Sequence, residues 1–114
     1  MCGAWHAAAQ DADRRAGELI NGSDYFALER MMRSSEARRL SPFMHRLTSA
    51  LTAHYFNRSA EACIHIGSLL RENQAELGTE SYMSMAFLMG RNLAGAGRYA
   101  EAAEFLDSMA GRGR

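Results

Sequence analysis

A six-residue phrase occurs twice in this chain and constrains its fold more than any other feature. Residues 57–62 are Asn-Arg-Ser-Ala-Glu-Ala, and forty positions later residues 97–102 are Gly-Arg-Tyr-Ala-Glu-Ala. Each copy stands between a long apolar helix pattern and a shorter one. This arrangement predicts a helix–turn–helix hairpin that is used more than once, as in helical-repeat proteins. Such repeats usually make surfaces for other molecules rather than reaction centres.

The composition favours helices. Hydrophobic residues make up 47% and charged residues 23% of the 114 residues, values typical of a folded domain. Most of the apolar residues are Ala, Leu and Met, whereas Ile occurs three times and Val is absent. Because the β-branched side chains that sheets favour are nearly missing, we expect one all-α domain over residues 1–114.

Helix caps and apolar periodicity predict six helices, paired as about three antiparallel hairpins over residues 4–34, 41–72 and 79–110. The expected helix caps are Ser23 or Asp24, Ser41 followed by Pro42, Ser59 and Thr79. The fifth helix, at about Glu80 to Ala94, is apolar on nearly its whole circumference. We therefore expect this helix to be buried between its neighbours.

The two copies of the phrase keep small residues where helices approach closely. Ala50 and Gly90 hold one equivalent position, and Ala62 and Ala102 hold another. The residues that follow a recognisable repeat pattern are Gly90, Leu93, Gly97, Tyr99, Ala102 and Leu106. In this spacing the chain resembles the tetratricopeptide repeat, with Leu replacing two of that family's aromatic residues.

The tetratricopeptide resemblance is good over Met83–Met109, fair over Phe43–Leu70 and poor over Trp5–Met32. It implies a short right-handed array of about three helical hairpins. The forty-residue spacing exceeds the usual length of that repeat, which implies longer helices or an extended turn at Asn73–Thr79.

A narrower resemblance rests on three segments, residues 56–58, 76–78 and 97–104. Around them, residues 40–106 are similar to the helical region that precedes the protease domain in some exported bacterial retropepsin-like aspartyl proteases. Those enzymes need an Asp-Thr-Gly or Asp-Ser-Gly triplet, and neither occurs here. The resemblance implies that this chain is only the non-catalytic helical part.

No set of residues in the sequence supports a reaction class. Cys63 and His65 point in nearly opposite directions on a helix, so they cannot share a metal from that helix alone. His54 lies on an apolar face and is predicted to be a core or interface histidine. Residues 95–100 match a glycine-rich phosphate fingerprint, but they follow a helix rather than a strand. We predict no catalytic residue, no metal and no cofactor.

The predicted function is therefore a non-catalytic scaffold that docks a peptide, a partner protein or another domain of a larger parent chain. Helical phase assigns the exposed face to the first helices of the later hairpins. The candidate partner-binding residues are His45, Thr48, Thr52, Tyr55, Ser84, Arg91 and Asn92.

A basic region offers an alternative function, the binding of nucleic acid or phosphate. Its residues are Arg30, Arg33, Arg38, Arg39 and Arg46. All thirteen basic residues are Arg, and thirteen acidic residues balance them, so the net charge is zero. Because nucleic-acid binders usually carry an excess of cations, we favour a solvated surface here.

The compartment depends on which resemblance holds. The protease-associated resemblance implies an exported or cell-envelope protein, and a cytoplasmic protein is expected otherwise. Cys2, which is followed by Gly3, is either the acylation site of an exported lipoprotein or an ordinary cysteine. No apolar run in the sequence is long enough for a membrane span.

Overall fold

The computed structural model describes the backbone of residues 2–112 and the side chains of residues 10–111. Across this part of the chain all the regular elements are helices, which confirms the all-α prediction. They are α1 (Cys2–Asn21), α2 (Tyr25–Arg33), the 3-10 helix η1 (Ser35–Arg39), α3 (Pro42–Tyr55), α4 (Ser59–Glu72), α5 (Gln74–Gly95) and α6 (Tyr99–Arg112). The side chain of Cys2 lies outside the described residues.

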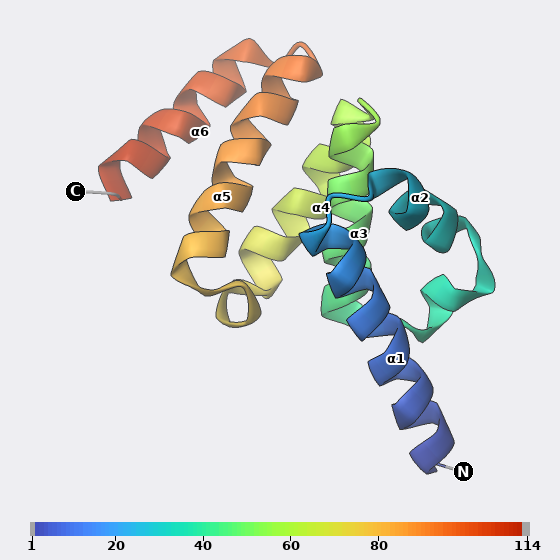
Figure 1. Cartoon of the computed structure of the whole chain (residues 1–114). Coiled ribbons are helices and arrows are strands. Elements are labelled where there is room, and N and C mark those ends of the chain that lie inside the picture. Colours follow the sequence, from blue (N-terminus) through green and yellow to red (C-terminus); the bar gives the residue numbers. More distant parts are fainter. Residues whose placement is uncertain (1, 113–114) are drawn as a thin grey trace.

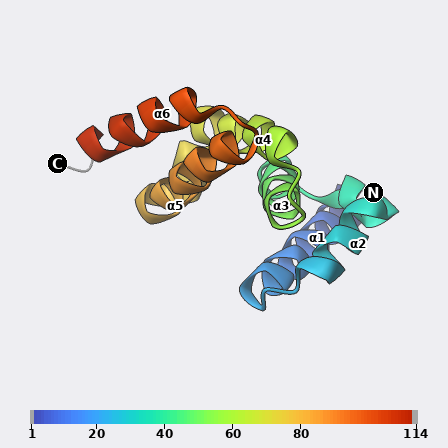
Figure 2. The same cartoon turned by 90° about the horizontal axis from the view of Figure 1, so that it is seen from above.

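The helices are stacked in chain order instead of gathering around one centre (Figures 1 and 2). Each α-helix contacts the next one along the chain, and contacts between alternate helices join α1 to α3 and α3 to α5. The molecule measures 49 × 27 × 22 Å. Its radius of gyration is 15.0 Å, whereas a compact domain of this length has about 13 Å. The described chain is therefore elongated.

One turn occurs three times, between α1 and α2, between α3 and α4, and between α5 and α6. Its central residue has a positive φ, which is 56° at Ser23, 61° at Asn57 and 80° at Gly97. The next amide then donates to a carbonyl five residues back, in the pairs Asp24–Leu19, Arg58–Ala53 and Arg98–Leu93. The repeated phrase thus forms the same turn twice, and a third copy is present where the sequence phrase is absent.

The three turns are unevenly spaced, with 34 residues from Ser23 to Asn57 and 40 residues from Asn57 to Gly97. The later helices are longer: α4 has 14 residues where α2 has 9, and α5 has 22 where α3 has 14. Part of α5 lies before a kink at Gly78, whose φ is 74°. Longer helices are one of the two explanations that the sequence offered for the forty-residue spacing.

Two of the predicted helix caps are confirmed. An Asp24 carboxylate oxygen accepts from the Ala27 amide at 3.1 Å, and the Ser41 hydroxyl accepts from the Met44 amide at 3.3 Å. The prediction for Ser59 is wrong, because Ser59 is the first residue of α4 and Arg58 occupies the cap position. The Arg58 side chain makes no capping bond there and is engaged with two carboxylates instead.

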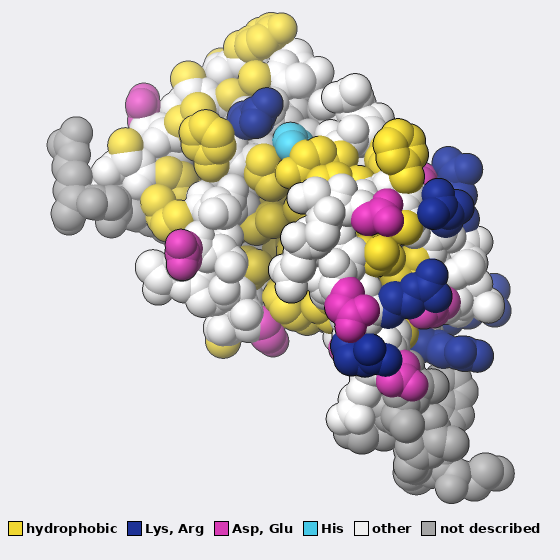
Figure 3. Space-filling model, in the orientation of Figure 1, with side chains coloured by type: hydrophobic (Ala, Val, Ile, Leu, Met, Phe, Trp, Pro, Cys, Tyr) yellow, Lys and Arg dark blue, Asp and Glu magenta, His cyan; other side chains and the backbone are white. Residues whose placement is uncertain are grey.

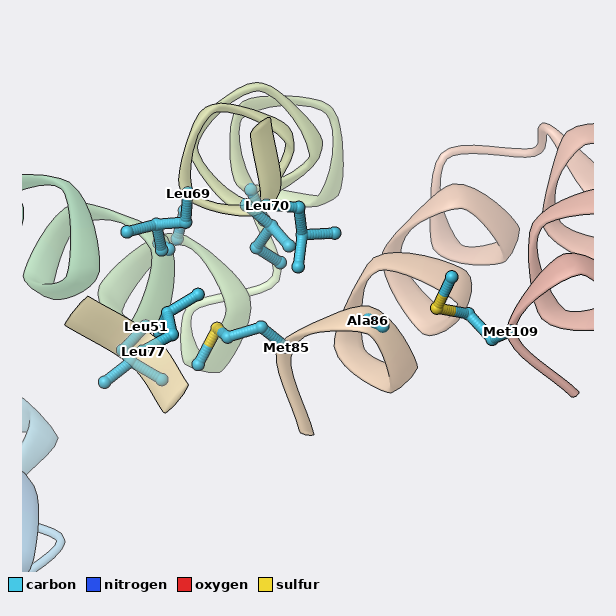
Figure 4. Close-up of a cluster of buried hydrophobic side chains, with 11 residues drawn as sticks. Leu51, Leu69, Leu70, Leu77, Met85, Ala86 and Met109 are labelled. Atoms are coloured by element: carbon cyan, nitrogen blue, oxygen red, sulfur yellow. The ribbon is translucent and has the colours of Figure 1, made fainter. Parts of the chain in front are cut away.

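The main hydrophobic core lies between α3, α4, α5 and α6 (Figure 4). Its buried side chains include Leu51, Leu69, Leu70, Leu77, Met85, Ala86 and Met109. A second cluster joins α1 and α2 through Ala16, Leu28 and Met31. Gly90 shows why a small residue is needed in the main core. A Cβ atom there would lie 2.6 Å from Cδ2 of Leu106, so α5 and α6 could not approach so closely.

The expectation that α5 is buried all round is wrong. Met83 and Phe87 are 40% and 59% exposed. The reason is that α3, α4 and α6 pack against α5 and leave one side of it without a neighbour among the described residues.

Candidate binding surface

The described helices form a concave face in which α3 lies between α1 and α5. Figure 2 shows α1 and α5 projecting from the same side of α3. The surface between α1 and α5, seen in Figure 3, is called the groove below. Contacts join α1 to α3 and α3 to α5, which places the three helices in one row. Figure 3 shows a strip of hydrophobic surface between α1 and α5, with charged side chains of both signs gathered beside α1.

Half-buried apolar side chains are present on all three helices that border this groove. Ile20 of α1, Phe43 and Leu47 of α3, and Leu88 of α5 each pack against the main core. Because these side chains keep some exposed area while resting on a packed core, they form firm apolar surface. A groove of this kind suits the apolar side chains of a docked segment.

A hydrogen bond joins α3 and α5, two of the helices that border the groove. The Asn92 amide nitrogen lies 2.9 Å from Nδ1 of His54 and also donates to the Leu88 carbonyl at 2.8 Å. Since this amide nitrogen is a donor, Nδ1 of His54 accepts and the neutral ring carries its proton on Nε2. Burial lowers the pKa of His54. His54 is therefore the interface histidine that its apolar position predicts.

An aromatic pair lies next to His54. The rings of Tyr25 and Tyr55 are stacked with centroids 3.8 Å apart, and the His54 ring meets the Tyr55 ring edge-on at 4.8 Å. A hydrogen bond with Tyr25 and burial raise the pKa of Tyr55. The positive charge of Arg91 acts on both His54 and Tyr55, lowering each pKa. The structure thus brings together Tyr55, Arg91 and Asn92, three of the predicted partner-binding residues.

The predicted partner-binding set divides by exposure. His45, Tyr55, Ser84 and Arg91 are exposed, as the helical phase indicates. The expected exposure of Thr48, Thr52 and Asn92 is wrong, because they are 0%, 2% and 3% exposed. The side of α3 that carries the two threonines packs against the first hairpin, and Asn92 is turned toward α3.

Sequence reasoning missed Tyr25, which contributes to the aromatic pair from the first hairpin. The poor repeat match of that hairpin left no signal that Tyr25 and Tyr55 would meet. Their aromatic character could have suggested that each ring stacks on another ring, but not that the two stack on each other.

The basic region is only partly available for an anion. Arg33 forms an ion pair with Glu29 at 3.2 Å, and Arg46 forms one with Glu72 at 2.7 Å. Arg30, Arg38 and Arg39 are exposed. A lone phosphate would therefore compete with existing carboxylates at two of the five arginines.

Two hollows are present on the described surface, each lined by three consecutive helices. One of about 450 Å³ is lined by residues of α2, α3 and α4, among them His45, Thr52 and Arg58. The other, of about 430 Å³, is lined by residues of α4, α5 and α6, among them Arg71 and Tyr82. In the first hollow the Arg58 guanidinium is held by Glu29 and Glu61, so its charge is already compensated.

Neither hollow contains a recognisable catalytic arrangement among the described side chains. Within the same residues, no group of three or more His, Cys, Asp or Glu side chains could hold a metal ion. Burial raises the pKa of the Cys63 thiol, which favours its protonated and less reactive form. None of the described helices is long and apolar enough to cross a membrane.

Comparison with known proteins leaves the resemblances untested. No protein family, no curated protein and no solved structure matches this chain.

Proposed function

We propose that this chain is a non-catalytic helical-repeat scaffold, similar to a short right-handed tetratricopeptide array, that docks a segment of another protein or domain. The observation that carries the proposal is the open apolar groove bordered by α1, α3 and α5. The groove joins helices from three parts of the chain, so a docked segment could contact all of them at once.

Two further observations support the repeat character. The same positive-φ turn occurs three times, and helices contact mainly their neighbours in the chain, as expected of a quasi-linear array. The small residues Ala50 and Gly90, at equivalent positions of the phrase, are both buried.

The occupant of the groove is a short segment with apolar side chains, because apolar area dominates the groove and its interior charges are few. Arg91, near His54 and Tyr55, adds one positive charge at the edge. The basic region remains a second candidate site, for phosphate or nucleic acid, because Arg30, Arg38 and Arg39 are exposed.

The scaffold proposal is tested with peptides selected from a random display library against the intact chain. Leu88→Glu places a charge on α5, one of the three helices that border the groove, and should weaken binding of the selected peptides at least about tenfold. Ile64→Glu is the matched control, because Ile64 is 68% exposed on α4, which does not border the groove. Failure to select any peptide, or equal loss in both variants, would count against the groove.

The second candidate site is tested with a labelled oligonucleotide titrated at several salt concentrations. Binding through the basic region should weaken steeply as salt is added and should be lost in the double variant Arg38→Glu, Arg39→Glu. Binding that ignores both changes would exclude this site.

A further inference from the structure

The α5–α6 hairpin has an outer face on which large apolar side chains lack a neighbour in the described fold. Its large exposed side chains are Met83 at 40%, Phe87 at 59%, Tyr99 at 71% and Leu106 at 39% exposure. Small residues of α6, including Ala103 and Ala110, are also exposed.

The preceding hairpin shows what such a face accommodates. Forty residues earlier, Leu106 corresponds to Ile66, Ala103 to Cys63 and Ala110 to Leu70. These earlier residues are 0%, 4% and 7% exposed. They are covered because α5 packs on α3 and α4, and Cys63 for example lies in one cluster with Leu93. The equivalent face of α5–α6 is therefore shaped to receive another helix.

The charges on this face favour a second copy of the same chain as the source of that helix. Glu80 and Arg91 are both exposed and stand eleven residues apart on α5, with Phe87 between them. At 100° per residue they lie on one stripe, and about 16 Å separates them along the helix. An antiparallel α5–α5 pairing places Arg91 of each copy beside Glu80 of the other. The apolar surface around Phe87 of one copy then contacts the same surface of the other copy.

The exposed area is in the range that a reversible dimer needs. Phe and Tyr side chains carry about 150–250 Å² each, so the four exposed fractions amount to roughly 400 Å² of surface per copy. Two copies would bury about 800 Å² from these side chains alone, which is the size of a weak, reversible contact.

We propose that two copies of this chain pair through the outer faces of their α5–α6 hairpins, around a two-fold axis near Phe87. A two-fold interface brings the same surface of both copies together, which is why an acid at one end of the stripe and a base at the other are complementary. The contact shares Arg91 with the surface near His54 and Tyr55, so Phe87→Glu, which leaves Arg91 in place, is the variant that distinguishes a failure of the dimer from a failure of segment docking.

The test is the molar mass of the intact chain by light scattering and sedimentation, from about 1 µM to about 500 µM. The account predicts a concentration-dependent rise from 12.6 kDa toward twice that mass. Phe87→Glu should raise the dissociation constant at least about tenfold, whereas Phe26→Glu, at a 73% exposed position on α2, should not. Circular dichroism verifies that both variants are folded.

A charge exchange tests the pairing without touching an apolar residue. Glu80→Arg alone and Arg91→Glu alone should each weaken the dimer, because like charges then face each other, and the double variant should restore it. A chain that is monomeric at every concentration, a dimer insensitive to Phe87→Glu, or a double variant weaker than both single ones would overturn the proposal.

Discussion

The guanidinium of Arg58 forms two hydrogen bonds with the carboxylate of Glu29, at 3.3 and 3.0 Å, and so ties α4 to α2 of the preceding hairpin. These hydrogen bonds lower the pKa of Glu29 and raise the pKa of Arg58. In the later copy of the phrase, Arg98 occupies the equivalent position and pairs with Glu101 in the first turn of α6, the helix that follows it. By the spacing of the turns, Cys63 stands where Glu29 stands one hairpin earlier.

Arg58→Ala and Arg98→Ala therefore should differ in their effect on stability. Loss of Arg58 leaves Glu29, whose side chain is 14% exposed, without its main cation, and should cost about 1 kcal/mol. Loss of Arg98, whose exposed partner Glu101 is only three residues away, should change the free energy of unfolding much less. Urea denaturation followed by circular dichroism measures both, and equal effects would contradict the inter-hairpin role of Arg58.

The repeated turn and the first helix predict opposite outcomes for two glycine substitutions. Gly97 has a φ of 80°, so Gly97→Ala should destabilise the chain by about 1 kcal/mol. Gly17 lies inside α1, and a Cβ atom added there would enter open space, with no neighbouring element of the described chain within 4 Å. Gly17→Ala should therefore stabilise the chain by about 0.5–1 kcal/mol. Thermal unfolding of the two variants would refute this interpretation if the midpoints moved in the same direction.

Two buried threonines on α3 form another matched pair. The hydroxyl of Thr52 donates to the Thr48 carbonyl at 2.9 Å, whereas the Thr48 hydroxyl has no hydrogen-bond partner among the described residues. Thr48→Val should therefore stabilise the chain by about 1 kcal/mol, and Thr52→Val should destabilise it by a similar amount. Chemical denaturation measures the free energy of unfolding of both variants. A destabilised Thr48→Val variant would mean that the Thr48 hydroxyl has a hydrogen-bond partner in solution.

The lowered pKa of His54 predicts that the folded chain loses stability on mild acidification. Its pKa is lowered in the folded chain, so the unfolded chain binds more protons as the pH falls below the ordinary value for histidine. The stabilising contribution of neutral His54 is fully present above the ordinary pKa of histidine. It disappears as the pH falls through the lowered pKa of the folded chain. His54→Gln should flatten the dependence between about pH 7 and pH 5. An unchanged slope in His54→Gln would contradict the assignment.

Features set by local chemistry could be predicted from the sequence. Asp24 and Ser41 cap their helices because a cap depends on amides only three residues away. The all-helical class likewise follows from the residue types. The turn at Gly97 also needs nothing beyond its own neighbours.

Features set by packing between hairpins could not be predicted. Helical phase places Thr48 and Thr52 on one side of α3, but it does not say that the first hairpin covers that side. For the same reason the phase of α5 could not show that Phe87 would remain exposed while Met85 became buried. The meeting of Tyr25 with Tyr55 depends on the relative position of two hairpins, for which a single sequence holds no direct signal.

The most direct test of the scaffold account is a map of backbone amide chemical shifts, recorded on the isotope-labelled chain with and without a selected peptide. The account predicts shifts concentrated along the groove, at α3 and α5 residues such as Leu47, Leu88 and Asn92, with little change at Ile64. Shifts confined to the exposed arginines of the basic region, or to the hollows beside α4, would contradict it.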